Sequence, residues 1–379
     1  MKKTRLLIFF IIFLIILAPS VFADDVSDKI TSSIDKELED FKNSLPDEVI
    51  EFLPNDVFKG DFSALLSDSL SVSSFWELII SYLFSGIDRV LKFFASILVL
   101  ILISSIFATL STNFSSGAVK NTFHICSTLC ISITVFNICI SICEMVSSYL
   151  NTLTGVMGAF SPIMTAMYIM SGNISSATVG NASILLFISI VDGFLVVMML
   201  PLVKVCMAFS CFNFIGGKHF GTLPKIIKTT FTSVTVFIMS IFMFVFSFKN
   251  VLSQGVDSLS IKTARFAISS FVPIVGASIN DALRTVSTSI SFIKSSCGII
   301  AIIAIAVIML PLIIFLFLNK LSFGILGSVS KMVGCEEQGS ILEEASSICT
   351  FLLTLVCCTC VLFIFALTLF IKSSVEVGV

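Results

Sequence analysis

CGIIAIIAIAVIMLPLIIFLFL, residues 297–318, contains no charged side chain. Since a helix needs about 20 apolar residues to cross the hydrocarbon core of a bilayer, this stretch predicts a membrane-spanning helix. Five further apolar stretches favour the same structure, and they lie at 93–110, 124–147, 183–209, 229–248 and 348–371.

The composition of the whole chain agrees with this prediction. Hydrophobic residues make up 56% and charged residues 12% of the 379 residues, whereas soluble domains carry roughly 25% charged residues. We therefore expect an all-α fold, that of a polytopic helical membrane protein. Two weaker apolar segments, 156–171 and 266–293, contain Pro and Gly and are expected to be broken helices, either re-entrant or fully crossing. The expected number of membrane segments is therefore six to eight.

The first 23 residues have the pattern of a signal peptide. Basic residues near the start precede an apolar stretch at 6–17, and Val21-Phe22-Ala23 offers a cleavage site after Ala23. The alternative is an uncleaved membrane anchor. In both cases the residues that follow begin outside the cytoplasm.

The next part of the chain is acidic. Residues 24–90 hold 15 of the 24 acidic residues and only five basic ones. Apolar residues in 30–45 recur at helical spacing, so we expect an acidic, extracytoplasmic helical region at 24–75. Trp76 and Tyr82 favour the membrane–water boundary, and residues 76–92 are interpreted as an interfacial helix. The polytopic membrane domain is expected at 93–372.

An unusual stretch, FVPIVGASINDALRTV at 271–286, interrupts the apolar pattern. A proline removes a backbone donor, and a break in lipid persists only where protein covers it or water reaches it. The stretch therefore predicts either the lining of a pore or cavity or a short surface helix whose charges reach the headgroups. Its candidate site residues are Pro273, Gly276, Asn280, Asp281 and Arg284.

Two further candidates lie in other segments. Asp192 is near the middle of the stretch 183–209, where an acid must be neutral, paired or hydrated; it indicates either a functional site or a structural hydrogen bond. Pro162 lies in Ala159–Met164, which matches Ser270–Val275 in pattern. This match predicts duplicated units at 124–209 and 229–318, followed by a final span at 348–371.

No enzyme signature is present in the sequence. It has no GxSxG, P-loop, HExxH or GxGxxG pattern and only two histidines, so we expect no catalytic residues, no cofactor and no enzymatic activity. The 12 cysteines lie mostly in apolar runs and are interpreted as small apolar residues rather than metal ligands. Binding of nucleic acid is not expected, because the soluble part is acidic.

The basic residues leave the orientation of the chain open. If the two broken segments are re-entrant, residues 204–228 are cytoplasmic and the basic residues of 249–265 lie outside; if both cross, the two groups exchange sides. In both arrangements residues 319–347 are cytoplasmic.

Three stretches carry a resemblance to a known family: FSPIM at 160–164, FVPIVGASINDALRTVSTSISFIKSSCGI at 271–299 and LNKLSFGILGSVSKMVG at 318–334. With the leader and the acidic stretch before them, they resemble the stage III sporulation protein AE family of endospore-forming Firmicutes. The resemblance implies a location in the mother-cell membrane around the forespore, the outer forespore membrane. It also implies membership of a trans-envelope channel, or feeding-tube, complex required for sporulation after engulfment.

The partners implied by the resemblance are the other proteins of the stage III sporulation A operon, including an ATPase and ring-forming proteins, and a forespore-side partner. A homo-oligomer is a further expectation, and the lipid bilayer is the surrounding medium. Two alternative functions remain open. One is a secondary transporter or channel with an intramembrane acid site, and the other is a membrane scaffold that recruits other sporulation proteins.

Overall fold

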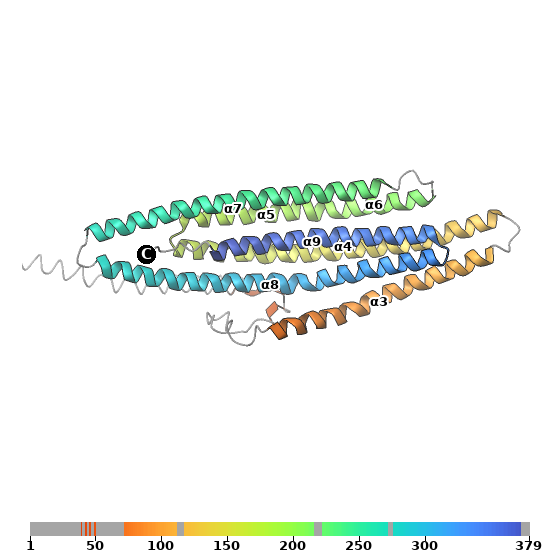
Figure 1. Cartoon of the computed structure of the whole chain (residues 1–379), viewed down its shortest axis with the longest axis horizontal. Coiled ribbons are helices and arrows are strands. Elements are labelled where there is room, and N and C mark those ends of the chain that lie inside the picture. Colours follow the sequence, from red (N-terminus) through yellow and green to blue (C-terminus); the bar gives the residue numbers. More distant parts are fainter. Residues whose placement is uncertain are drawn as a thin grey trace, which may run out of the picture.

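The computed structural model describes residues 39, 42–43, 45–46, 49–50, 72–111, 117–215, 222–271 and 276–372. Within this part of the chain, long helices lie side by side in an elongated bundle (Figure 1). In chain order they are α3 (Val72–Ser111), α4 (Gly117–Met170), α5 (Ile174–Ile190), the π-helix η4 (Val191–Val196), α6 (Val197–Ile215), α7 (Leu223–Phe271), α8 (Gly276–Met332) and α9 (Glu336–Lys372).

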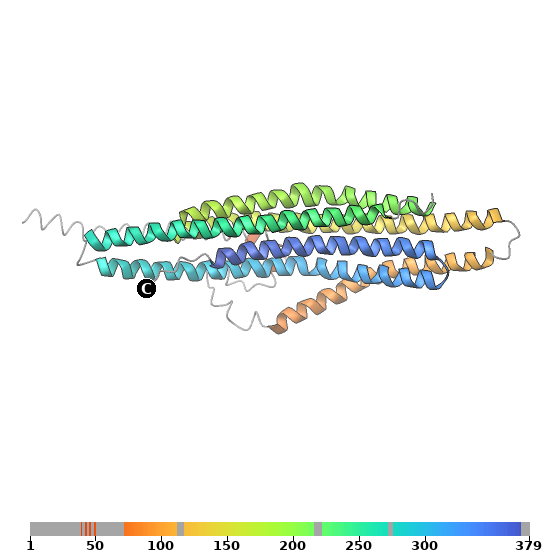
Figure 2. The same ribbon diagram turned by 45° about the horizontal axis from the view of Figure 1, so that its top comes forward.

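The predicted all-α membrane fold is confirmed. In the described part of the chain, six helical segments are long and apolar enough to cross a membrane, with α5, η4 and α6 forming one of them. Successive segments run in opposite directions (Figures 1 and 2). The end of α6 and the start of α7 (204–215 and 222–228) therefore lie at the same end of the bundle as residues 319–347. This is the arrangement expected if neither of the two weak segments, 156–171 and 266–293, adds a membrane crossing of its own.

The expected break at Pro162 is wrong. Residues 156–170 are the last turns of the continuous helix α4, and Pro162 lies inside that helix with its ring exposed. A proline is tolerated in a membrane helix where neighbouring groups satisfy the freed backbone atoms. Pro201 in α6 and Pro311 in α8 likewise lie within continuous helices. A proline alone was therefore a poor signal of a break in this chain.

Two helical hairpins close instead at glycines. Gly172, between α4 and α5, has φ 76°, and Gly334, between α8 and α9, has φ 84°. The amide of Asn173 donates to the carbonyl of Tyr168, and that of Cys335 donates to the carbonyl of Ser330, at 2.8 and 2.9 Å. This is the Schellman geometry, in which a left-handed glycine ends a helix and bonds its last carbonyls.

The second weak segment differs from the first. Helix α7 ends at Phe271 and α8 begins at Gly276, so Pro273 lies outside the described residues. The match between 159–164 and 270–275 therefore compares the interior of one helix with the end of another. Residues 76–92, expected as an interfacial helix leading into the first span, form one continuous helix with 93–110 in α3.

The described part of the acidic N-terminal region packs on the bundle. Leu45 is 5% exposed and Val49 is fully buried. Pro46 and Val49 line a small cavity together with Tyr82 of α3, Tyr149 of α4 and Pro311 of α8. This region therefore lies against the helices rather than apart from them.

Helices α7 and α8 extend beyond the other helices at one end of the bundle (Figures 1 and 2). Gly298 of α8 faces Ile371, the second-to-last residue of α9, so the turns of α8 before Gly298 pass the end of α9. Asp257 of α7 is hydrogen-bonded to the first turn of α5, so the turns of α7 after Asp257 pass the start of α5. We call residues 249–271 and 276–294 the arm; its base, at Asp257 and Lys294, is still buried against α4, α5 and α9.

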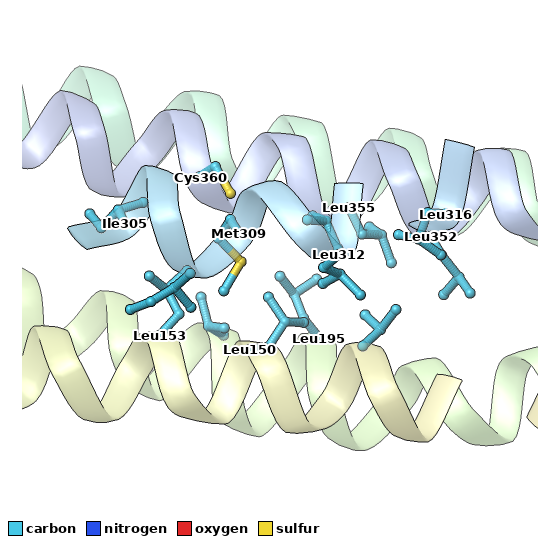
Figure 3. Packing of buried hydrophobic residues seen from close by; sticks show 14 of the residues in the cluster. Leu150, Leu153, Leu195, Ile305, Met309, Leu312, Leu316, Leu352, Leu355 and Cys360 are labelled. Atoms are coloured by element: carbon cyan, nitrogen blue, oxygen red, sulfur yellow. The ribbon is translucent and has the colours of Figure 1, made fainter. Parts of the chain in front are cut away.

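The core of the bundle lies between α4, α8 and α9. In the most apolar 18-residue stretch of α8 and of α9, 56% is buried inside the bundle, whereas in that of α7 the buried share is 17%. Figure 3 shows the close packing of this core, in which Leu150 and Leu153 of α4 and Leu195 of η4 meet α8 and α9 through Ile305, Met309, Leu312, Leu316, Leu352, Leu355 and Cys360. Helix α7 is thus peripheral, and α8 and α9 are central.

Small residues bring α8 and α9 together near their connecting turn. A Cβ atom on Gly339 would lie 2.8 Å from the carbonyl oxygen of Gly327, whereas one on Gly324 would lie 3.7 Å from the Ser346 hydroxyl. Close approach of backbones through small residues is a common means of helix association in lipid, where apolar burial between helices gives little driving force.

We expect Gly339→Ala to destabilise the purified protein by roughly 1–3 kcal/mol, because the Gly327 carbonyl is backbone and cannot rotate away. The matched control Gly324→Ala, whose new methyl group makes only an ordinary contact, is expected to change stability little. Thermal unfolding of both variants in one detergent checks the difference. Equal midpoints for the two variants would contradict the packing described.

Candidate functional site

Asp192 lies on η4 and is half-buried. Its Oδ1 atom is 3.0 Å from the hydroxyl of Thr154 on α4. Thr154 is 5% exposed. The same hydroxyl is 3.0 Å from the backbone carbonyl oxygen of Asn151. This acid, for which the sequence left a neutral, a paired and a hydrated state open, has a hydrogen-bond partner on the neighbouring helix.

The π-helix at this position was not predicted. Residues Val191–Val196 widen the helix by the i→i+5 pattern between two ordinary α-helical stretches. Such π-bulges occur frequently at functional sites. Nearer the hairpin turn, α4 and α5 make another polar contact, in which the Ser161 hydroxyl donates to Asn181 Oδ1 at 2.7 Å. Polar contacts thus join α4 to both α5 and η4.

A second acid, Asp257 of α7, is 3% exposed and binds the first turn of α5. Its carboxylate accepts hydrogen bonds from the amides of Ser175 and Ser176 at 3.0 and 2.9 Å and from the Ser176 hydroxyl at 2.7 Å. A carboxylate at a helix N-terminus satisfies unpaired amides and meets the positive end of the helix dipole. Asp257 therefore fixes α7 to the start of α5.

A third polar cluster joins α7 to α9 at the opposite end of the bundle. The ammonium group of Lys228, which is 6% exposed, lies 2.5 Å from Glu344 Oε1 and 2.7 Å from the Ser347 hydroxyl. A groove opens beside this pair and is lined by hydroxyl groups of Thr229, Thr232, Ser233, Ser346, Ser347, Thr350 and Thr354. Nearby, Lys331 of α8 pairs with Glu343 of α9 at 2.6 Å.

Lys294 of α8 is fully buried. Its ammonium group lies 4.5 Å from the ring centre of Tyr168 and 5.1 Å from that of Phe370. Cation–π contacts of this kind are stronger where water is excluded. They join α8 to the ends of α4 and α9 at the base of the arm.

The predicted site residues are not brought together as a group. Asp192 lies in the bundle, Pro162 lies in the interior of α4, and Pro273 and Ala23 lie outside the described residues. Gly276 is the first residue of α8, and the side chains of Asn280, Asp281 and Arg284, on its first turns, also lie outside the described part. Among the polar candidates predicted from the sequence, Asp192 is thus the one whose hydrogen bond the described part of the structure contains.

The polar residues that sequence reasoning missed are single charges in apolar surroundings. Asp257, Lys228 and Lys294 each lie in a segment that looks amphipathic or at the edge of an apolar stretch. The neighbouring residues in the sequence therefore do not indicate that these side chains are buried. Their partners come from helices distant in sequence. Among the described residues, no cluster of three or more His, Cys, Asp or Glu side chains could hold a metal ion.

We expect Asp257→Ala to lower stability by roughly 2–4 kcal/mol, because three hydrogen bonds to a buried carboxylate are lost and the amides of α5 stay unpaired. Ser260→Ala is the control, since the exposed Ser260 hydroxyl bonds only to Val256 of its own helix. Thermal unfolding in detergent measures both. A similar small loss in both variants would show that the cap contributes little.

Comparison with known proteins gives the family. The family described as "Stage III sporulation protein AE" matches residues 59–374. The chain is also 22% identical, over 313 residues, to the stage III sporulation protein AE of Bacillus subtilis (strain 168), and the alignment covers 80% of this chain and 78% of that protein. No solved structure matches. Since the family match covers most of the chain, including every helix described above, the protein belongs to the stage III sporulation protein AE family.

Proposed function

We propose that this protein is the membrane component of a trans-envelope channel complex between mother cell and forespore, located in the outer forespore membrane. Membership of the family gives it a role in sporulation, and its six apolar helices make it a multi-pass membrane protein. The observation that carries the proposal further is the arm, because it extends beyond any single bilayer and is available to other proteins.

The lengths of α7 and α8 support this reading of the arm. They contain 49 and 57 residues, or about 74 and 86 Å at 1.5 Å per residue. The hydrocarbon core of a bilayer is only about 30 Å thick. A large part of each helix must therefore project from the membrane.

The charges locate the projecting part. On α7, residues 229–248 lie between Lys228 and Lys249 and carry no charge, which is the length of one crossing. On α8 the uncharged residues 295–319 lie between Lys294 and Lys320. Residues 249–271 and 276–294 therefore fall beyond the hydrocarbon, and they are the arm.

The orientation of the arm follows from the leader. If the residues after Ala23 begin outside the cytoplasm, α3 starts there, and alternation of the helices puts the connection between α7 and α8 on the same side. The arm then projects into the space between the two membranes that surround the forespore. The end of the bundle with Lys204, Lys228, Lys320 and Lys331 is then cytoplasmic, in line with the positive-inside rule.

The surface of α7 suits a helical partner. Exposed residues recur at alternating spacings of four and three along it, in the pattern of a coiled-coil seam; they are Ile241, Val245, Phe248, Leu252, Gly255, Leu259 and Lys262. On the arm, Leu252 is 56% and Leu259 68% exposed. Ile241, Val245 and Phe248 of this row belong to the crossing 229–248, whereas Leu252 and Leu259 lie beyond it, where exposed apolar residues mark a site of protein interaction.

The charges beside the seam define the partner further. Lys249 lies beside the seam and Lys262 ends it, and both are exposed on the arm. The partner we propose is an amphipathic helix of another protein of the complex, with an apolar face against Leu252 and Leu259 and acidic residues opposite the two lysines. The ring-forming proteins and the forespore-side partner are the candidates to supply it.

We expect Leu259→Glu to reduce the yield of heat-resistant spores by at least about tenfold, since a buried charge at the centre of an interface costs more than 1.4 kcal/mol. Ser260→Glu adds the same charge to the adjacent exposed position off the seam and is expected to sporulate normally. Both variants must accumulate in the membrane to the wild-type level, as an immunoblot checks.

The partner is measured in the same cells. Full-length Leu259→Glu purified from sporulating cells is expected to lose a ring-forming or forespore-side protein that copurifies with Ser260→Glu. If the same sporulation proteins copurify with both variants, or if none copurifies with the wild type, the proposed role of the arm is wrong.

A further inference from the structure

One hydroxyl group of the bundle faces two acceptors. Thr154 Oγ1 lies 3.0 Å from the Asn151 carbonyl oxygen and 3.0 Å from Asp192 Oδ1. A hydroxyl has a single hydrogen to donate and two lone pairs that accept. Thr154 can therefore donate to one of the two oxygens at a time, and its direction depends on whether Asp192 carries a proton.

The two arrangements use the same heavy-atom positions. When Asp192 is ionised, Thr154 donates to it. When Asp192 is protonated, its own O–H group donates to Thr154 Oγ1, and the Thr154 hydroxyl turns to the Asn151 carbonyl. The Thr154 hydroxyl and Asp192 Oδ1 are hydrogen-bonded to each other in both states, so the contact between the two side chains persists whichever of them donates.

No charged side chain on the packed helices fixes Asp192 in one state. The elements that pack on η4 include α4, α5 and α6, and α5 carries no charged residue. Leu195 of η4 also packs in the core with α8 and α9, and Phe194 of η4 stacks on Phe231 of α7. The base of α7 three residues before Phe231 is Lys228, and its ammonium group is already paired with Glu344 of α9. Along α4 the nearest acid is Glu144, ten residues before Thr154, and along α6 the nearest base is Lys204, twelve residues after Asp192. At 1.5 Å per residue these lie about 15 and 18 Å away along the bundle.

The other titratable groups on these helices lie elsewhere. Tyr149 of α4 lines the cavity shared with α3 and α8, and the Cys206 thiol of α6 donates to the Pro224 carbonyl at 3.8 Å. In lipid an ionised carboxylate without a counter-ion is costly. Water or a charged partner at the half-exposed side of Asp192 would favour the ionised form.

We propose that Asp192 is an intramembrane proton-binding site whose two states are both satisfied by Thr154. In the binding step a hydronium ion from the adjoining aqueous phase gives its proton to the Asp192 carboxylate, an O–H bond forms, and a water molecule is released. The negative charge of Asp192 is neutralised, and no other covalent bond changes. The site uses residues apart from the arm, so it stands independently of the role proposed for the arm.

The π-helix gives this site room to respond. Its backbone bonds span five residues instead of four over Val191–Val196, so the turn that carries Asp192 is wider than an ordinary helical turn. The carboxyl group sits at the second position of this turn. Changes in its hydrogen bonding therefore act where the helix departs from regular geometry.

The test uses the full-length protein in phospholipid vesicles and dicyclohexylcarbodiimide, a reagent that modifies protonated carboxyl groups in apolar surroundings. Mass spectrometry of peptides locates the adduct. We expect an adduct at Asp192 that diminishes as the pH rises, and none at this position in Asp192→Asn.

Variants of Thr154 test the switch itself. Thr154→Val removes the donor to the ionised form, so half-maximal labelling is expected to move to a higher pH than in the wild type. Thr154→Ser keeps the hydroxyl and is expected to label as the wild type does. Thr154→Ala serves the same purpose if the valine variant does not give the wild-type elution profile in detergent.

Three results would overturn the proposal: no adduct at Asp192 at any pH, an adduct that does not depend on pH, or the same labelling midpoint in the serine variant and in the variants without a hydroxyl. These results do not bear on the spore yield of the arm variants. The two proposals can therefore fail separately.

Discussion

Hydrocarbon offers no hydrogen-bond partner, and this constraint governs the arrangement of every polar group inside the bundle. The described acids and bases of the interior are each held by a group from another helix: Asp192 by Thr154, Asp257 by Ser175 and Ser176, and Lys228 by Glu344. These contacts are few, but each joins two different helices of the bundle. The register between helices therefore depends on a handful of polar pairs.

The constraint also separates the helices into two classes. Helices α8 and α9 are central, closely packed through glycines, and joined by a short turn at Gly334. Helix α7 is peripheral, and much of its surface is apolar and exposed along a length greater than one bilayer. The first class forms the body of the bundle, and the second presents an exposed apolar surface.

Much of the fold could be predicted from the sequence. The six apolar stretches, such as 297–318 and 348–371, all became helices, since length and hydrophobicity alone decide that outcome in lipid. The boundaries could not be predicted in the same way. Proline was taken as a breaker, yet the helix passes through Pro162, whereas the actual turn lies ten residues later at Gly172. A small polar turn, Ser171-Gly172-Asn173, was the better signal.

The candidate site was predicted only in part. Asp192 was found because an acid inside an apolar stretch is costly wherever it lies. Its partner was not found, because Thr154 lies 38 residues earlier in the chain, on another helix, and threonine is common in membrane helices. Asp257 was missed for a related reason: in the sequence it looks like a solvated residue of an amphipathic helix, and only the approach of α5 buries it.

The bonds of Asp257 have a mechanical consequence. They tie α7, at the point where it leaves the bundle, to the first turn of the helical rod that contains η4. A pull on the end of α7 near Phe271 is therefore transmitted through this tie to the start of α5, and the π-helix that such tension meets along this rod carries Asp192. Strain imposed from outside the membrane thus has a direct route to the widest turn within it.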